Sequence, residues 1–364
     1  MPAHRAAPSD HLPKYAKVLA HLQAVIRAAA PGTALPTITA LRAEFGVSQA
    51  TIDRALGELR AQGLIESRRG AGTFVSGRLK RRHYGLLFSH ILFDSRVGTF
   101  YHLLFAALQR RLEASGALLR LYVPNSPDAD VETKVPLLVA DAQQGLVDGL
   151  ILIQHWRAHP LPLSIPVVSL GRLPFAAHRV IPDDLALARC AAHALFGRQC
   201  RRAAFIGLDV SQDGPLARDV FLREAARLGI AANSDATVIA GGYFIDGARQ
   251  SGREAFHALW ARLHEKPDGL VVMNEYVAQG VIAAMGELGL RPGRELVVVS
   301  HVTKGASVLT NTEVIRMEDD PDDIAAGIVE ALDSAMDGSP CTDRFVAPRS
   351  ADTSPEPLVA GQPG

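Results

Sequence analysis

The segment from residue 35 to residue 75 most constrains how this chain can fold. Two short helical patterns are followed there by a glycine-tipped hairpin. In the first pattern Leu41 and Phe45 lie four residues apart, on one face of a helix, and Gly46 ends it in a conformation that glycine tolerates. A threonine ahead of this helix, Thr37 or Thr39, can cap its N-terminus. The segment therefore predicts a compact unit in which two helices are joined by a tight turn.

The second helical pattern begins after Ser48, whose hydroxyl can cap it. Its buried stripe is formed by Ile52, Leu56 and Leu59, which leaves the opposite face exposed near the N-terminal end. Exposed side chains at that end of a second helix are the ones that reach base edges in a major groove. The order of these elements is that of a winged helix-turn-helix.

The hairpin is predicted from two short strands, residues 64–68 and 73–76, joined by a tip at residues 69–72. The tip is basic and contains two glycines, which allow the backbone to approach a phosphate or a minor groove closely. Twelve residues of the helices and hairpin are candidates for DNA contact. They are Thr37, Thr39, Ser48, Gln49, Ala50, Thr51, Asp53, Arg54, Arg68, Arg69, Gly70 and Gly72.

The charges of the chain are divided unevenly between its two ends. Residues 1–82 hold 13 lysines and arginines against 5 acids, whereas residues 83–364 hold 25 against 33. A basic small domain ahead of an acidic larger one indicates a polyanionic partner for the first only. Two short helices with a glycine turn also occur in domains that never touch nucleic acid, and the basic run before residue 83 can be a solvated linker.

The N-terminal motif can be compared with a known family. Its positions are Leu35-Pro36, Phe45-Gly46-Val47-Ser48, Thr51-Ile52, Ala55-Leu56, Leu59, Gly63-Leu64-Ile65, Gly70 and Gly72-Thr73-Phe74-Val75. With this motif, residues 14–76 resemble the DNA-binding domain of the GntR family of bacterial transcription regulators. The family often has arginine where this chain has Thr39, Gln49 and Asp53, so a different operator is implied. Gln49 has the donor and acceptor needed to pair with adenine.

Length and composition divide the chain further. We expect a disordered N-terminus over 1–13, a winged helix-turn-helix domain over 14–77, a basic linker over 78–82, a two-lobed domain over 83–346 and a disordered tail over 347–364. No apolar run approaches the ~20 residues of a membrane-spanning helix, and residues 1–13 lack a secretion signal. The three cysteines have neither paired nor metal-ligand spacing, which indicates reduced thiols in the cytoplasm and no metal site.

From residue 83 onward, short apolar runs alternate with helical stretches. Eight runs are expected to be buried strands: residues 84–88, 118–123, 149–153, 167–170, 203–206, 237–240, 269–273 and 296–300. Six stretches between them are expected to be helices: residues 99–114, 131–144, 185–195, 215–228, 247–263 and 277–288. This alternation predicts an α/β fold with parallel sheets, and the number of strands favours two lobes.

Several short motifs in this region occur in a recognisable order. They are Val147-Asp148-Gly149-Leu150, Ile165-Pro166-Val167-Val168, Gly171-Arg172, Val180-Ile181-Pro182-Asp183-Asp184, Arg201 to Gly207, Arg218 with Phe221, and Pro267-Asp268-Gly269-Leu270 leading to Asn274-Glu275. Together they resemble the effector-binding domain of the LacI family, built like periplasmic sugar-binding proteins. The resemblance covers residues 83–346 and implies two lobes joined by three crossovers, with a ligand between them.

Ligands of open α/β sheets bind beyond the carboxyl ends of strands, and that rule selects candidates independently of any family. They are Ser89, His90, Phe93, His155, Trp156, Arg172, Asp183, Asp184, Arg218, Asn274, Glu275 and His301. Polar groups with a few aromatic rings suit a sugar. Any one of these residues can also be an ordinary loop residue.

One departure weakens the expectation of a sugar. The family usually continues its last strand into Gly-Tyr/Phe-Asp-Asp, whose aspartate contacts sugar hydroxyls, whereas this chain has Ser300-His301-Val302-Thr303. Either Asp183, Asp184 or Glu275 replaces that acid, or the ligand is not a typical hexose. The acidic run at residues 318–323 lacks the spacing of an EF-hand loop and is expected to cap a helix from about residue 322.

The sequence contains no nucleophile elbow, no phosphate-binding loop and no cysteine–histidine metal set, so we expect neither an enzyme nor a cofactor. The sequence as a whole predicts a transcription regulator, for example a repressor, that is cytoplasmic and homodimeric. A small-molecule effector, a carbohydrate by preference, would control its affinity for a double-stranded DNA operator. The alternative is an α/β ligand-binding protein whose N-terminal domain contacts protein rather than DNA.

Overall fold

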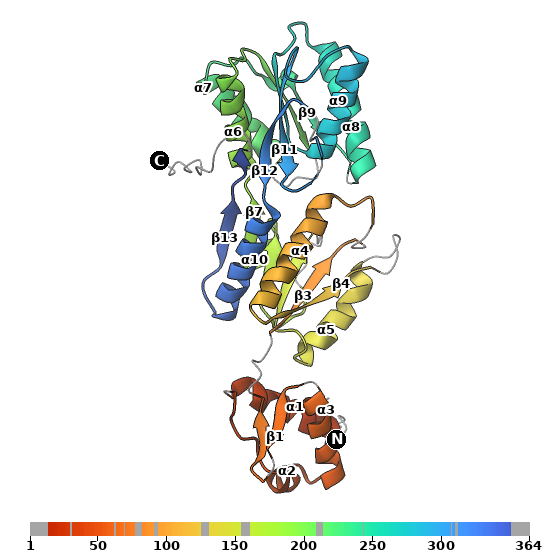
Figure 1. Cartoon of the computed structure of the whole chain (residues 1–364), viewed down its shortest axis with the longest axis vertical. Coiled ribbons are helices and arrows are strands. Elements are labelled where there is room, and N and C mark those ends of the chain that lie inside the picture. The colour runs from red at the N-terminus through yellow and green to blue at the C-terminus, as the bar shows by residue number, and fades with distance from the viewer. Residues whose placement is uncertain are drawn as a thin grey trace, which may run out of the picture.

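The computed structural model describes residues 14–29, 31–61, 63–68, 70–76, 82–90, 94–124, 131–153, 161–208, 214–242, 244–306, 308–309 and 312–350. They form a small N-terminal domain and two α/β lobes, which follow one another along the longest axis of the molecule (Figure 1). The predicted fold class, a winged helix-turn-helix followed by a two-lobed α/β domain, is confirmed. Within the described residues, no helix is long and apolar enough to cross a membrane.

The N-terminal domain consists of three helices and a hairpin. Its elements are α1 (Lys14–Ala28), α2 (Ile38–Phe45), α3 (Gln49–Ala61), β1 (Ile65–Arg68) and β2 (Gly72–Val75). Apolar side chains of all five elements share one core, in which Leu41, Ile52 and Leu59 are fully buried. The predicted stripe of the second helix therefore lies in this core.

Lobe 1 is built on a six-stranded sheet in the order β13-β7-β6-β5-β3-β4, with every neighbouring pair parallel. Its strands are β3 (His83–Phe88), β4 (Leu118–Tyr122), β5 (Gly149–Ile153), β6 (Val167–Leu170), β7 (His178–Pro182) and β13 (Thr342–Val346). Its helices are α4 (Thr99–Ala114), α5 (Val135–Gln143) and α10 (Pro321–Met336). Helices α4 and α10 share a core with one face of the sheet, and α5 packs on the other.

Lobe 2 has a second six-stranded sheet, in the order β14-β12-β11-β10-β8-β9. Its strands are β8 (Ala203–Leu208), β9 (Thr237–Ala240), β10 (Gly269–Val272), β11 (Val297–Thr303), β12 (Val314–Asp319) and β14 (Arg349–Ser350). Its helices are α6 (Asp184–Gly197), α7 (Gly214–Arg227), α8 (Ile245–Arg262) and α9 (Glu275–Glu287). Helices α8 and α9 cover one face, and α6 and α7 cover the other.

Three crossovers join the lobes: β7 to α6, β12 to α10, and β13 to β14. The last of these corrects the predicted end of the folded chain. Disorder was expected from residue 347, yet Ser350 and Arg349 pair with Met317 and Glu318 at the edge of the lobe 2 sheet. Backbone hydrogen bonding to an open sheet edge holds a segment whose composition is that of a loop. Residues 1–13 and 351–364 lie outside the described residues.

The predicted linker also needs a correction at its last residue. The guanidinium of Arg82 donates to Tyr84 and to Asp333, so this residue belongs to lobe 1. The rest of the expected linker, residues 78–81, lies outside the described part of the chain.

Candidate functional site

The second helix of the N-terminal domain, α3, presents a polar end to solvent. Gln49, Ala50, Asp53 and Arg54 are exposed, and Thr51 is half-buried. The Ser48 hydroxyl accepts from the Thr51 backbone N–H at 3.3 Å and lies 2.9 Å from the Thr51 hydroxyl. Ser48 therefore caps α3, as its sequence position predicts.

The helix before it is capped in the same way. Thr37 Oγ1 accepts from the Ala40 backbone N–H at 3.2 Å, which selects Thr37 over Thr39 as the cap of α2. Thr39 is exposed within the first turn. Gly46 adopts φ 58° and closes the helix, so the turn between α2 and α3 has the geometry that its glycine indicates.

Two cationic side chains of this domain are held by neighbours. The Arg54 guanidinium lies 4.6 Å from the centroid of the Tyr15 ring on α1. In the hairpin, Arg68 pairs with Glu66 at 2.8 Å and lies 4.5 Å from the centroid of the Phe74 ring. Glu66 thus offsets part of the positive charge that the hairpin offers to a phosphate.

The hairpin tip has the expected backbone. Gly70 and Gly72 both have positive φ, 76° and 113°, and both are exposed. Register pairs Ile65 with Val75 and Arg68 with Gly72. Arg69, the remaining candidate of the tip, lies outside the described residues.

The effector-site candidates of lobe 1 are only partly described. Ser89 and His90 are half-buried just after β3, and burial lowers the pKa of His90, which favours a neutral imidazole. Phe93, His155 and Trp156 lie outside the described residues. The Arg172 guanidinium lies 5.3 Å from the centroid of the Phe345 ring on strand β13.

Two candidates, Asp183 and Asn274, act as helix caps. The Asp183 carboxylate accepts from the Ala186 backbone N–H at 2.8 Å, and Asp184 follows in the first turn of α6. The Asn274 side-chain oxygen accepts from the backbone N–H groups of Tyr276 and Val277 at the start of α9. Both contacts lie within lobe 2 and satisfy donors that a helix start leaves free.

Glu275 is buried and turned toward the end of β11. Its carboxylate accepts from the Thr303 backbone N–H at 2.8 Å and lies 3.1 Å from the Thr303 hydroxyl. Burial raises the pKa of Glu275. The fold therefore brings Glu275 and Thr303 together, but the two residues hydrogen-bond to each other.

His301 forms a second internal pair, with Asp319 of β12. Its Nε2 lies 3.1 Å from Oδ2 of Asp319, while its buried Nδ1 has no hydrogen-bond partner. Burial alone would lower the pKa of the imidazole, but the charge and hydrogen bond of Asp319, with the charges of Glu275 and Asp184, raise it to about 9. The imidazole is therefore a cation at neutral pH.

Arg218, the candidate on α7, pairs with the next residue of the chain. Its guanidinium donates to the Asp219 carboxylate at 2.8 and 2.9 Å, and its side chain remains 35% exposed. Such a pair is weak enough to be exchanged for a ligand.

Of the residues described here at which the lobes meet, sequence reasoning selected only His90. The Tyr276 hydroxyl on α9 accepts from the Thr99 backbone N–H on α4 at 2.9 Å. The Arg96 guanidinium lies 4.8 Å from the centroid of the Phe244 ring, and the His90 ring contacts the same ring edge-on. A faint signal was present, because α4 starts with a glycine where a capping side chain is usual.

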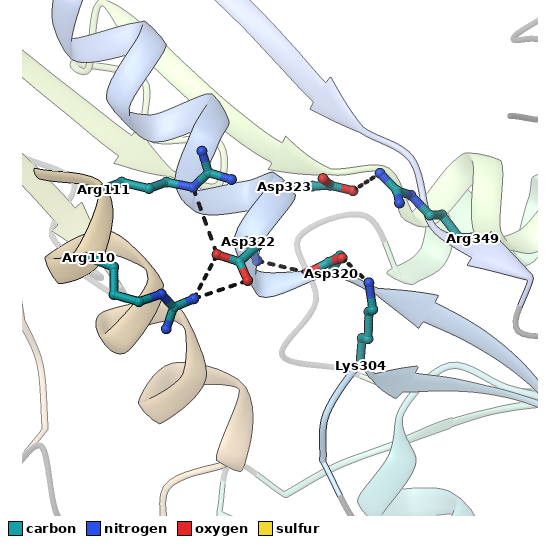
Figure 2. Close-up of polar contacts among 7 residues, drawn as sticks. All are labelled: Arg110, Arg111, Lys304, Asp320, Asp322, Asp323 and Arg349. Atoms are coloured by element: carbon teal, nitrogen blue, oxygen red, sulfur yellow. Dashed lines mark hydrogen bonds and ion pairs between the residues drawn. The ribbon is translucent and has the colours of Figure 1, made fainter. Parts of the chain in front are cut away.

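The acidic run before α10 is an ion-pair cluster at a crossover, shown in Figure 2. Asp320 caps α10 by accepting from the Asp322 backbone N–H at 3.0 Å, which confirms the predicted capping role. Lys304 pairs with Asp320 at 2.6 Å, Arg110 with Asp322 at 2.9 Å, and Arg349 with Asp323. Among the described residues, no group of histidine, cysteine and acid side chains is placed to hold a metal.

Family comparisons match both parts of the chain. Residues 14–75 match the model of the gntR family of bacterial regulatory proteins, and residues 192–352 match the periplasmic-binding-protein-like domain. The chain joins a GntR-family DNA-binding domain to a periplasmic-binding-protein-like domain. Over 45 residues it is 53% identical to the mannosyl-D-glycerate transport/metabolism system repressor MngR of Escherichia coli (strain K12). That match covers 12% of this chain and spans only 19% of the curated relative.

Solved structures share the fold at low sequence identity. A LacI transcriptional regulator from a Rhodococcus species has a TM-score of 0.60 at 19% identity, over 74% of this chain and 96% of that one. The complex of the transcriptional regulator CelR with cellobiose has a TM-score of 0.60 at 17% identity, over 84% and 90% of the two chains. A putative ribose operon repressor from Burkholderia thailandensis has a TM-score of 0.58 at 18% identity, over 74% and 99%.

Proposed function

We propose that this protein is a transcription regulator that binds operator DNA through its N-terminal domain and a small-molecule effector between its two lobes. The observation that carries the proposal is the capped helix α3, whose N-terminal residues are exposed beside the glycine-tipped hairpin. Both lie in the N-terminal part of the chain, which has a net positive charge, whereas the rest of the chain has a net negative charge. Gln49 and Arg54 would read bases, and Arg68 and Arg69 would hold the phosphate backbone.

A dimer would be needed to read two half-sites in successive major grooves, about 10 base pairs apart. Support for self-association comes from the open edge of lobe 1, where Leu118 and Leu121 of β4 and Leu137 of α5 are each at least 41% exposed. Apolar side chains on an unpaired edge strand favour association with another chain. Binding to DNA in a bacterial cell would place the protein in the cytoplasm.

The effector would be a small polar molecule, by preference a carbohydrate. CelR binds cellobiose in the similar structure, and the candidates of this chain combine cationic, acidic and aromatic groups. Among the candidates that the structure describes, Arg218 pairs with an exposed neighbour, Asp219, and such a contact can be exchanged for a ligand. We propose Arg218, Asn274 and an acid among Asp183, Asp184 and Glu275 as ligand contacts.

The first experiment measures the affinity of the full chain for duplex DNA over a range of salt concentrations. Each phosphate neutralised should steepen the dependence of log affinity on log salt by about 0.9. Binding that ignores salt, or no binding at all, would favour the alternative in which the N-terminal domain contacts protein.

The second experiment is a thermal-shift screen of mono- and oligosaccharides, cellobiose included, on the full chain. A ligand at one hundred times its dissociation constant stabilises a protein by about 2.7 kcal/mol. A shift caused by a nucleoside or amino acid but by no carbohydrate would reject the sugar class. If Arg218→Ala leaves the ligand-induced thermal shift unchanged, Arg218 does not contact the ligand.

A further inference from the structure

Two helices that begin at the boundary between the lobes lack a side-chain cap of their own. Helix α4 has Gly98 at its N-cap, which carries no side chain, and helix α8 has Phe244, whose side chain accepts no hydrogen bond from the first turn. By contrast, α6, α9 and α10 are capped by Asp183, Asn274 and Asp320. A helix start without a cap leaves backbone donors free.

Each of these two helices receives its partner from the opposite lobe. The first N–H of α4, on Thr99, donates to the Tyr276 hydroxyl of lobe 2 at 2.9 Å, and that hydroxyl lies 3.2 Å from the Thr99 hydroxyl. The first N–H of α8, on Ile245, donates to the Arg96 carbonyl of lobe 1 at 3.2 Å. The capping is reciprocal, since each lobe supplies an acceptor to a helix of the other.

Side-chain packing supports both contacts. A Cβ on Gly98 would lie 3.3 Å from Cε2 of Tyr276, so the ring rests directly against the glycine. The Arg96 side chain is fixed by a bidentate pair with Asp94, with a shortest distance of 2.6 Å, and covers the Phe244 ring. The contacts are specific in shape as well as in hydrogen bonding.

We propose that Arg96, Thr99, Phe244, Ile245 and Tyr276 form a latch that holds the two lobes together before any effector binds. Separating the lobes leaves the first N–H of α4 and of α8 without protein acceptors at once, so the two halves of the latch open together. This inference rests on the proposed function: the latch sets the affinity for the effector. A ligand that binds between lobes already joined does not spend binding free energy on joining them.

The test is amide hydrogen exchange of the full chain without ligand, comparing wild type with Tyr276→Phe. The variant keeps the ring against Gly98 and removes only the hydroxyl, which accepts from the Thr99 N–H and donates to the Thr99 hydroxyl. We expect exchange on the order of tenfold faster at Thr99, and also at Ile245, which the hydroxyl does not touch. Exchange at Val277 and Asp322, capped by Asn274 and Asp320 within their own segments, should stay unchanged.

Gly98→Ala provides an independent route to the same result, because its methyl group presses on the Tyr276 ring while leaving the hydroxyl in place. The matched control is Tyr122→Phe, which removes a tyrosine hydroxyl bonded to Asp141 at 2.6 Å inside lobe 1. The latch would be overturned if exchange became faster at Thr99 alone or at neither amide. It would also be overturned if the control variant gave the same increase at both amides. Since the assay needs neither DNA nor effector, its outcome is separate from that of the proposed regulator.

Discussion

The imidazole Nε2 of His301 on β11 lies 3.1 Å from the Asp319 carboxylate on the neighbouring strand β12. The pair sits immediately before the crossover to α10, and both side chains are largely buried, at 17% and 9% exposure. Because the pKa of His301 is raised to about 9, the fold carries a paired cation there at neutral pH. A buried charge of this kind couples stability to pH.

The first prediction concerns the pH dependence of stability. A histidine whose pKa is raised on folding from 6.5 to about 9 adds stability that is complete below about pH 6.5 and is lost as the pH rises through about 9. The loss amounts to at most about 3.5 kcal/mol, at about 1.4 kcal/mol for each pKa unit. Urea unfolding between pH 6 and pH 10 should show this loss in the wild type and not in His301→Gln.

The control for that prediction is His257→Gln. His257 also lies beside a carboxylate, 2.8 Å from Glu287, but both side chains are exposed to solvent and the pair is screened. This variant should keep the wild-type pH dependence. If the two glutamine variants behave alike, the His301–Asp319 pair is not the source of the effect.

The second prediction concerns the crossing of α8 and α9. These helices touch backbone to backbone, since a Cβ on Gly280 would lie 1.9 Å from the Arg249 carbonyl oxygen. Gly280→Ala should therefore force the helices apart and destabilise the protein by more than about 3 kcal/mol. Gly286→Ala, in the same helix with open space around its Cβ, should be neutral or stabilise by up to about 1 kcal/mol in chemical denaturation.

The third prediction separates the two roles of Asp320, which caps α10 and pairs with Lys304. Partial burial acts to raise the pKa of Asp320, but the hydrogen bonds from Lys304 and from the Asp322 N–H lower it overall, so its contribution is lost as the pH falls. Asp320→Ala should cost about 1–2 kcal/mol, whereas Asp320→Asn keeps a capping oxygen and should cost less. Equal losses in thermal unfolding would show that the charge, not the cap, matters.

The fourth prediction concerns the hairpin. Glu66 pairs with Arg68, so Glu66→Gln should free a cation and raise affinity for DNA of any sequence. The salt dependence should steepen by up to about 0.9 in the logarithmic slope. Fluorescence anisotropy would measure both quantities. Glu113→Gln makes the same charge change on α4 of lobe 1 and should leave DNA binding unchanged; an equal gain there would mean that net charge alone is responsible.

The fifth prediction concerns base readout by α3. Gln49 is exposed at the first position of this helix, so Gln49→Ala should cost about 1–3 kcal/mol on the true operator and little on random DNA. A competition assay with both DNAs would measure the difference. Equal loss on both would assign Gln49 to positioning on the phosphate backbone.

Short apolar runs were a reliable guide to most strands of the two lobes. Each of the eight predicted strands corresponds to an observed strand, and residues 99–114 coincide with α4. The sequence did not reveal β7, β12, β13 and β14 as strands; all four contain charged or polar residues, and β13 and β14 lie at sheet edges. Edge strands need only one bonded neighbour and carry a weak apolar pattern.

The candidate site was harder to predict than the fold. The rule that ligands bind beyond strand ends correctly placed Asp183, Asn274 and Glu275 at the carboxyl edge of a sheet. It did not predict which groups their side chains contact. Tyr276 lies directly after two of the candidates, yet its hydroxyl meets Thr99, which is 177 residues away. No local pattern encodes that contact.

By itself, the sequence determined the winged helix-turn-helix, the division into two α/β lobes and the cap of α10, because apolar periodicity, glycine turns and capping residues act over a few neighbouring positions. Only the tertiary structure decided which polar groups are consumed in pairs, that Arg349 closes a sheet edge, and that Tyr276 and Arg96 cap helices of the opposite lobe. Those outcomes depend on how separately formed elements pack, and burial then leaves each polar group to find its partner wherever the chain has brought one near.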